Sequence, residues 1–172
     1  MRRHHSRIAI SALTIVALTS CWNPFAPTEG ALEGVASLIL TERRNPDEVL
    51  QNFRYAYIYR DSVAYSRLFD TSFVFLYDDP DIGGGAGGYN YWGLDTELRT
   101  TGALFRRFDH FTLVWNATTG RDTSQSGEIS LTKTFDLSVG GVKPLTGNAI
   151  FDFREDSTNN IWLITRWQDN SF

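Results

Sequence analysis

The spacing of apolar residues changes along the chain and separates helical from extended segments. After Asn45, apolar side chains recur three and four residues apart, which predicts an amphipathic helix with one buried face. Asn45 is a suitable N-cap, Pro46 suits the first helical position, and the two acidic residues that follow suit the first turn. The pair Asp61-Ser62 predicts the start of a second, shorter helix.

The apolar period changes to two at Thr71, and the alternation up to Tyr77 predicts a strand. The segment 78–88 starts with acidic residues and ends in a glycine-rich run, which predicts a loop. From Tyr91 to Phe108 the helical period returns, with acidic residues early and arginines late, as the helix dipole favours. These features predict a third helix over 91–108.

The rest of the chain alternates between apolar and polar residues in four runs, at 111–115, 129–139, 148–153 and 161–167. The longest run, 129–139, alternates so regularly that one face of its strand must be buried. Turn-forming residues such as Gly140-Gly141 separate the runs, so we expect consecutive hairpins. The element order therefore predicts an α+β domain with three helices before most of the sheet.

This order and the residues that carry it resemble the NTF2-like (SnoaL-like, cystatin-like) cone. The resemblance covers residues 45–169 and rests on the helix start Asn45 to Leu50, the strand Phe73-Val74-Phe75 and the last strand Ile161 to Ile164. The texture is similar to that of uncharacterised bacterial lipoproteins of this type. It implies three N-terminal helices packed on a bent, mostly antiparallel sheet, and a homodimer formed through the outer face of that sheet.

The first twenty residues form a basic leader, with Arg2, Arg3 and Arg7, followed by the apolar run 8–18. The run is too short to span a bilayer permanently and predicts a signal peptide. It ends in Leu18-Thr19-Ser20-Cys21, which resembles the bacterial lipobox. The resemblance implies cleavage before Cys21 and a mature Cys21 that carries a diacylglycerol and an amide-linked acyl chain such as palmitate, which would attach the protein to a membrane.

The sequence thus predicts three parts: a lipoprotein signal peptide at 1–20, a tether at 21–44 with two prolines near its start, and an NTF2-like domain at 45–172. Trp22 stands where the inner-membrane retention signal would place an aspartate. We therefore expect a protein anchored in a bacterial cell envelope, in the outer membrane rather than the inner one.

Composition and charge exclude several classes of protein and of partner. With 42% hydrophobic residues in 172, the chain can bury a core, which excludes a disordered or fibrous protein. The net charge is −4, and it becomes −7 when the three leader arginines are removed, so we expect no nucleic-acid partner. The single cysteine allows no internal disulfide, and no cofactor motif or metal-ligand cluster occurs in the sequence, so we expect no cofactor and no metal.

Two residues are candidates for chemistry inside the cone, where the enzymes of this fold place a general base. His110 is the only histidine after the leader and follows Asp109; the alternative is a surface histidine at the junction of two elements. Lys133 falls in phase with the apolar side of the strand 129–139, so its ammonium would face inward and contact an anionic ligand or take part in catalysis. The alternatives are an aliphatic stem that reaches past the sheet edge and a bulge that reverses the phase.

Asp136 and Asp152 occupy polar phases of their strands and are interpreted as solvated residues. The chain has enough aromatic residues to line a ligand site together with Lys133, although packing in the core would also explain their number. They are Tyr57, Tyr77, Trp92, Trp115 and Trp167.

These features favour a non-enzymatic binding or interaction protein. Its occupant would be a small apolar ligand in the cone or a protein partner on the sheet, a second copy of the chain included. The alternative function is that of a lyase or isomerase with a general base inside the cone.

Overall fold

The computed structural model describes residues 39–82, 88–124 and 126–171. The folded unit begins at Ile39, ahead of the boundary at residue 45 drawn from the sequence. Thr41 donates its backbone N–H to Asn52 Oδ1 at 2.8 Å, and the carbonyl of Arg43 accepts from the N–H of Trp162 at 2.8 Å. The predicted signal peptide, Cys21 and the tether before Ile39 lie outside the described residues. None of the helices in the described ranges has the length and apolar character needed to cross a membrane.

The first two helices begin where the sequence predicts. Helix α3 (Pro46–Tyr59) starts after Asn45, whose side-chain oxygen accepts from the N–H of Glu48 at 2.9 Å, and it ends at Arg60 in the left-handed conformation. Helix α4 (Ser62–Ser66) starts after Asp61, whose carboxylate accepts from the N–H groups of Val63 and Ala64. Hydrogen bonds within the first turn therefore determine where α3 and α4 begin.

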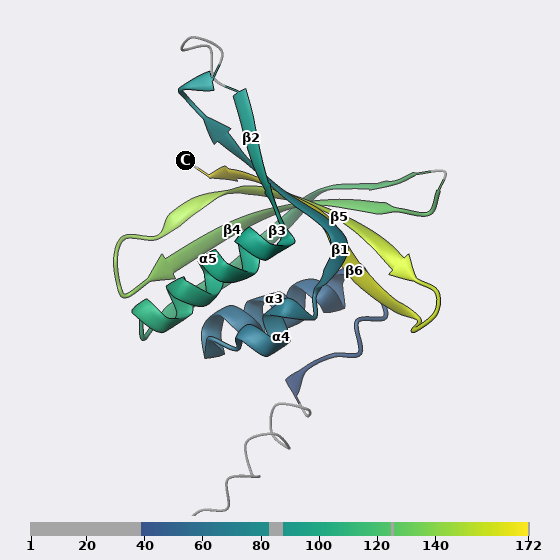
Figure 1. Cartoon of the computed structure of the whole chain (residues 1–172), viewed down its shortest axis with the longest axis horizontal. Helices are drawn as coiled ribbons and strands as arrows, with labels where there is room; N and C mark the ends of the chain where they lie inside the picture. Colours follow the sequence, from purple (N-terminus) through teal and green to yellow (C-terminus); the bar gives the residue numbers. More distant parts are fainter. Residues whose placement is uncertain (1–38, 83–87, 125, 172) are drawn as a thin grey trace, which may run out of the picture. The chain divides into compact units, whose positions relative to one another are not determined.

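Six strands form one sheet in the order β2-β1-β6-β5-β4-β3. In the described sheet, β1 and β6 pair in parallel, and the other four pairs of neighbouring strands are antiparallel. All three helices lie on the same side of this sheet (Figure 1), which we call the inner face, and the opposite side is the outer face. The strands are β1 (Phe69–Asp79), β2 (Gly88–Gly93), β3 (Phe111–Thr123), β4 (Ile129–Val139), β5 (Leu145–Asp156) and β6 (Ile161–Ser171).

The start of the third helix differs from the prediction. Helix α5 (Leu94–Arg107) begins three residues after Tyr91, because Tyr91 and Trp92 belong to strand β2 and pair with Leu76 and Phe75 of β1. Pairing with a preformed neighbouring strand outweighs the helical spacing of these residues. Strand β1 likewise runs to Asp79, into the predicted loop, and residues 83–87 of that loop lie outside the described residues.

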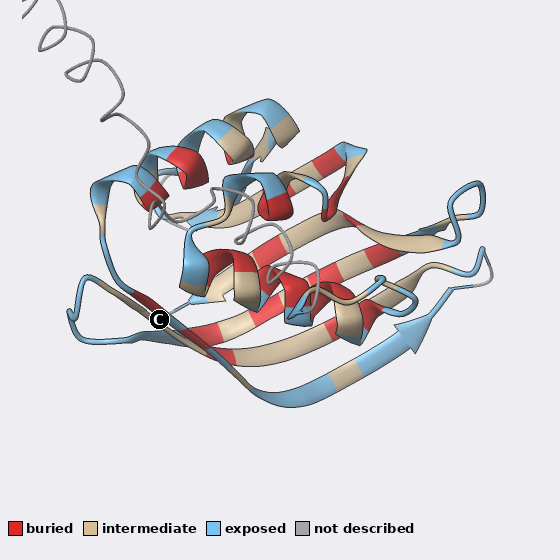
Figure 2. Cartoon of the chain, turned by 90° about the horizontal axis from the view of Figure 1, so that it is seen from below, coloured by how far each residue is buried: buried red, intermediate tan, exposed pale blue. Residues whose placement is uncertain are grey.

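The core lies between the inner face and the helices, and Figure 2 shows buried residues on the sheet-facing side of the helices and on the inner side of the strands. Phe53 of α3 is at its centre, with six aromatic rings within 6.4 Å of its ring centroid. Strands β3 to β6 follow each other as hairpins, as predicted, and Gly140 and Gly141 form the β4–β5 turn with positive φ. The α+β architecture predicted from the sequence is confirmed.

Candidate functional site

A band of large apolar side chains crosses the inner face in register. Trp92, Phe75, Trp167 and Phe151 are cross-strand partners on β2, β1, β6 and β5, and we call them the aromatic row. The ring centroids of Phe75 and Trp92 are 4.4 Å apart, those of Phe75 and Trp167 4.7 Å, and those of Phe151 and Trp167 5.5 Å. The aromatic row thus forms a continuous wall under the helices.

One step further along the same strands, the inner face becomes polar. Asn90, Tyr77, Asp169 and Lys133 occupy corresponding positions on β2, β1, β6 and β4, with the buried Ala149 of β5 between the last two. We call these four residues the polar row. The ring of Tyr77 lies 4.8 Å from that of Trp92, so the two rows meet at these aromatic side chains.

Asp169 supplies the carboxyl of the polar row. Burial raises its pKa, while the hydrogen bonds from Ser171, including a backbone N–H at 3.0 Å, act in the opposite direction. Within the described residues, no lysine or arginine forms an ion pair with it. Asp169 is therefore a half-buried acid beside an aromatic wall, without a protein cation to neutralise it.

Asp169 was not among the residues selected from the sequence, although a signal for it exists. The alternation of the last strand, extended past Trp167, places Asp169 on the same face as that tryptophan. The strand predicted from the sequence ends at residue 167, and the residues that follow it are polar. In the structure β6 continues to Ser171, paired with β5 on one side and β1 on the other.

A second acid missed by the sequence analysis lies under the aromatic row. Glu97 of α5 is 2% exposed and accepts hydrogen bonds from Tyr65 Oη at 2.7 Å, Thr101 Oγ1 at 2.8 Å and Trp92 Nε1 at 2.8 Å. Burial raises the pKa of Tyr65 well above its usual value, and the neighbouring Tyr57 and Glu97 act in the same direction. Glu97 therefore joins β2, α4 and α5 through neutral donors and fixes the indole of Trp92.

Lys133 keeps the predicted phase and lies on the inner face. Its ammonium is 3.1 Å from Asp47 Oδ1 at the start of α3, and Arg121 Nη1 is 3.3 Å from the other carboxylate oxygen. The side chain of Lys133 is 14% exposed and that of Asp47 54%, so the ammonium reaches a carboxylate that is open to solvent. The ammonium is thus directed to the helix start and not across Ala149 toward Asp169.

His110 lies elsewhere. Its side chain is exposed, immediately before the buried Phe111 that opens β3, and its ring nitrogen is 3.4 Å from Thr112 Oγ1. Asp109 pairs with Arg60 at 3.6 Å instead of orienting the imidazole. The structure therefore does not bring His110 to the polar row.

The remaining predicted aromatic residues pack within the core. Tyr57 is 4% exposed and stacks on Phe53 at 5.0 Å, and burial raises the pKa of its hydroxyl, with Glu97 and Asp169 acting in the same direction. Trp115 donates its indole N–H to the carbonyl of Leu50 at 3.0 Å. Among the residues that the structure describes, the indole nitrogen of Trp167 is buried and has no hydrogen-bond partner. Of the predicted set, the structure joins Tyr77, Trp92 and Trp167 in one wall.

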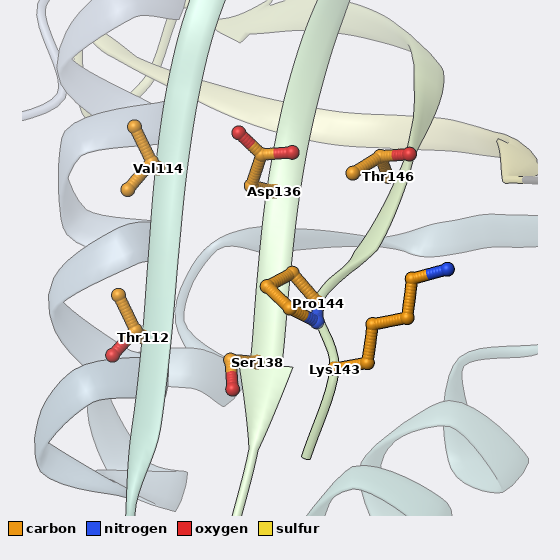
Figure 3. A pocket seen from close by; sticks show the side chains of 7 residues that line it. All are labelled: Thr112, Val114, Asp136, Ser138, Lys143, Pro144 and Thr146. Atoms are coloured by element: carbon orange, nitrogen blue, oxygen red, sulfur yellow. The ribbon is translucent and has the colours of Figure 1, made fainter. Parts of the chain in front are cut away.

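The outer face carries a different kind of site. A hollow of about 430 Å³ lies near the β4–β5 turn (Figure 3). Asp136 lies between Val114 and Thr146 of the neighbouring strands and accepts from Asn116 Nδ2 at 2.8 Å, while Pro144 and Lys143 come from the segment just before β5. Thr112, Ser138 and Thr146 complete the lining. This volume is at the lower end of that of small-molecule sites.

A metal centre is not indicated by the described ranges, where no three histidine, cysteine or acidic side chains gather around a common point. Where the two rows meet, the polar groups are the Asp169 carboxyl, the Tyr77 hydroxyl and the Asn90 amide, which donates to Asp79 at 3.2 Å. Such groups can bind a ligand by hydrogen bonds and charge, and Asp169 can in addition exchange a proton.

No protein-family model matches the chain, and no curated protein matches it. Solved structures, by contrast, do match the chain. The chain is similar to a protein from Novosphingobium aromaticivorans assigned as a scytalone dehydratase, with a TM-score of 0.60, 14% identity and coverage of 81% of this chain and 88% of that one. Nuclear transport factor 2 from Cryptosporidium parvum matches with a TM-score of 0.57, 12% identity and coverage of 73% and 90%.

A third similar structure, a protein with a cystatin-like fold from Nostoc punctiforme, has a TM-score of 0.54, 10% identity and coverage of 83% of this chain and 92% of that one. At such identities the likeness concerns the fold alone. The described domain has the NTF2-like, cystatin-like α+β fold, as the sequence resemblance implies.

Proposed function

We propose that this chain is a lipid-anchored protein of a bacterial cell envelope whose NTF2-like domain binds a small ligand with an apolar body at the inner face of the sheet. The anchoring part rests on the leader and on Leu18-Thr19-Ser20-Cys21, and Trp22 favours the outer membrane. The binding part rests on the folded domain.

The observation that carries the binding proposal is the junction of the aromatic and polar rows. Tyr77, Trp92 and Asp169 are each half-buried, so part of each side chain faces solvent next to a large apolar wall. A wall of aromatic rings with few polar groups is the usual composition of a ligand site. An apolar ligand would gain burial against the rings, and its polar group would contact Asp169.

The anchoring proposal is tested by Cys21→Ser in the full chain. We expect wild-type protein in the detergent phase after phase separation, and the variant in the aqueous phase as an uncleaved precursor. The matched control is Ser20→Ala, which keeps a small residue before the cysteine and should leave partitioning unchanged. A Cys21→Ser variant that partitions and matures as wild type does would show that this cysteine is not lipidated.

The binding proposal is tested by mass spectrometry of small molecules that copurify with the protein, combined with Tyr77→Leu. We expect an apolar compound to copurify with wild type and to be lost from the variant. Tyr91→Leu is the matched control, because Tyr91 lies on the outer side of the adjacent strand and is 71% exposed. Equal loss from both variants, or retention by both, would argue against a site at Tyr77.

A lyase or isomerase activity is the second candidate, and the raised pKa of Asp169 is what favours it. A carboxyl with a raised pKa is a better general base near neutral pH than an ordinary aspartate. The similarity to a protein assigned as a scytalone dehydratase agrees with this class but adds only the fold. For a compound identified by copurification, turnover that Asp169→Asn abolishes without loss of binding would support the enzyme, and binding without turnover would support the binding module.

A further inference from the structure

We infer that the inner-face ligand carries a positive charge, as a protonated amine or a quaternary ammonium group attached to its apolar body. This inference rests on the proposed binding function and adds the chemical class of the ligand. It follows from the charges that face the polar row and from the aromatic rings beside them.

The charges at this position are negative. Asp169 is half-buried, and Asp79 of β1, two residues beyond Tyr77 on the same face, is half-buried and accepts from Asn90 Nδ2 at 3.2 Å. Glu97 adds a third carboxyl beneath Trp92. An anionic ligand placed against Tyr77 would therefore meet like charges from β1, β6 and α5.

Among the described residues, no lysine or arginine forms an ion pair with Asp169 or with Asp79. Lys133, the cation of the polar row, pairs with Asp47, and Arg121 shares the same carboxylate. Arg166 belongs to the strand that carries Asp169, but it lies on the outer face, where it pairs with Asp152 at 3.0 Å. Asp169 is thus left with the hydrogen bonds from Ser171, which satisfy part of its capacity as an acceptor without neutralising its charge.

The aromatic rings supply the second half of the site. The ring centroids of Tyr77 and Trp92 lie 4.8 Å apart and the ring planes are inclined by 41°, so the two rings pack on each other while both side chains stay half-buried. The face of an aromatic ring attracts an ammonium group, most strongly for tryptophan and tyrosine, and the attraction grows where water is excluded. A carboxylate next to inclined rings is a combination that recognises organic cations. A neutral apolar ligand would bury Asp169 further without compensating its charge.

The test compares two probes of nearly the same shape, benzyltrimethylammonium and the neutral neopentylbenzene, bound to the full chain in detergent and measured by calorimetry near neutral pH. We expect the cation to bind about tenfold more tightly than the neutral probe. Asp169→Asn should weaken binding of the cation and strengthen binding of the neutral probe, which no longer buries an uncompensated charge, so that the tenfold advantage disappears. Asp136→Asn, in the outer hollow, is the matched control and should change neither.

A second pair of variants keeps the test independent of Asp169. Tyr77→Phe retains the ring and should retain cation binding, whereas Tyr77→Leu should lose it. Equal binding of both probes, or tighter binding of the neutral one, would overturn the cation inference and leave the proposed apolar site standing. Binding of neither probe would count against both the inference and the proposed function. Tight cation binding that Asp169→Asn and Tyr77→Leu leave intact would place the cation elsewhere and overturn the inference.

Discussion

The two faces of the sheet use the same strands for different purposes. On the inner face, Leu131, Phe151 and Phe153 are fully buried under the helices, and even the acid Glu97 is enclosed. On the outer face, Val114 is 40% exposed and Tyr91 71% exposed, and a hollow with two charged side chains lies open. The inner face therefore determines stability, whereas the outer face is free to serve association.

The largest difference is expected for apolar truncations. Phe53→Ala should destabilise the domain by about 3–5 kcal/mol, because the ring fills the centre of an aromatic cluster that cannot collapse around the space. Val114→Ala on the outer face should stay within about 0.5 kcal/mol. Urea unfolding followed by tryptophan fluorescence measures both, and similar costs for the two variants would contradict the division between faces.

The next effect concerns the buried acid. Glu97→Leu leaves the hydroxyls of Tyr65 and Thr101 and the indole N–H of Trp92 without their acceptor, so we expect a loss of about 2–4 kcal/mol. Glu97→Gln should cost less, because an amide oxygen can still accept from the indole while the hydroxyls turn to accept from the amide nitrogen. Thermal unfolding of both variants gives the order, and a leucine variant as stable as the glutamine variant would show that these hydrogen bonds add nothing.

A smaller effect of opposite sign is expected at Asp169. Its pKa is raised in the folded state, so the charged carboxylate destabilises folding above that pKa. Asp169→Asn should therefore stabilise the domain at neutral pH, by less than about 1 kcal/mol because the side chain is partly solvated. The advantage should disappear as the pH falls through the raised pKa to below 3.8, the usual pKa of an aspartate. Unfolding curves over this range measure it.

Asp70 is the control for Asp169, because its pKa is shifted in the opposite direction. Burial acts to raise the pKa of Asp70, but hydrogen bonds from Ser72 and Arg154 outweigh it and lower the pKa, with Arg154 Nη2 at 2.8 Å. Asp70→Asn should destabilise the domain above pH 3.8, and the difference should vanish as the pH falls through the lowered pKa. Asparagine variants of Asp70 and Asp169 that shift stability in the same direction would contradict these assignments.

The smallest effect on stability is expected on the outer face, where the readout is association. We expect the domain to form a dimer through this face, as the resemblance implies. Ile150→Glu, on the outer phase of β5, should convert the dimer to a monomer in light scattering with little change in unfolding. Val63→Glu, on helix α4 at a position that is 61% exposed, is the control for one added negative charge. A wild-type monomer at all concentrations would remove the dimer proposal.

Much of this fold is determined by local sequence. Asn45, Pro46 and Asp61 set helix starts because capping involves residues within one turn, and the strict alternation of residues 129–139 sets the buried face of β4 because strand side chains alternate. The same alternation correctly predicts that Lys133 lies on the inner face. The partner of Lys133 could not be predicted, since Asp47 is 86 residues away in the sequence.

The candidate site itself was decided by tertiary structure. Glu97 shares a helical face with Leu94 and Thr101, yet only the approach of Tyr65, from another helix, and Trp92, from a strand, turns this acid into a buried acceptor. Asp169 faces Tyr77 because β1 and β6, which are far apart in the sequence, pair in parallel. Local periodicity determines which side of an element a residue occupies. The register between distant strands determines which residues meet, because that register depends on the packing of the whole core.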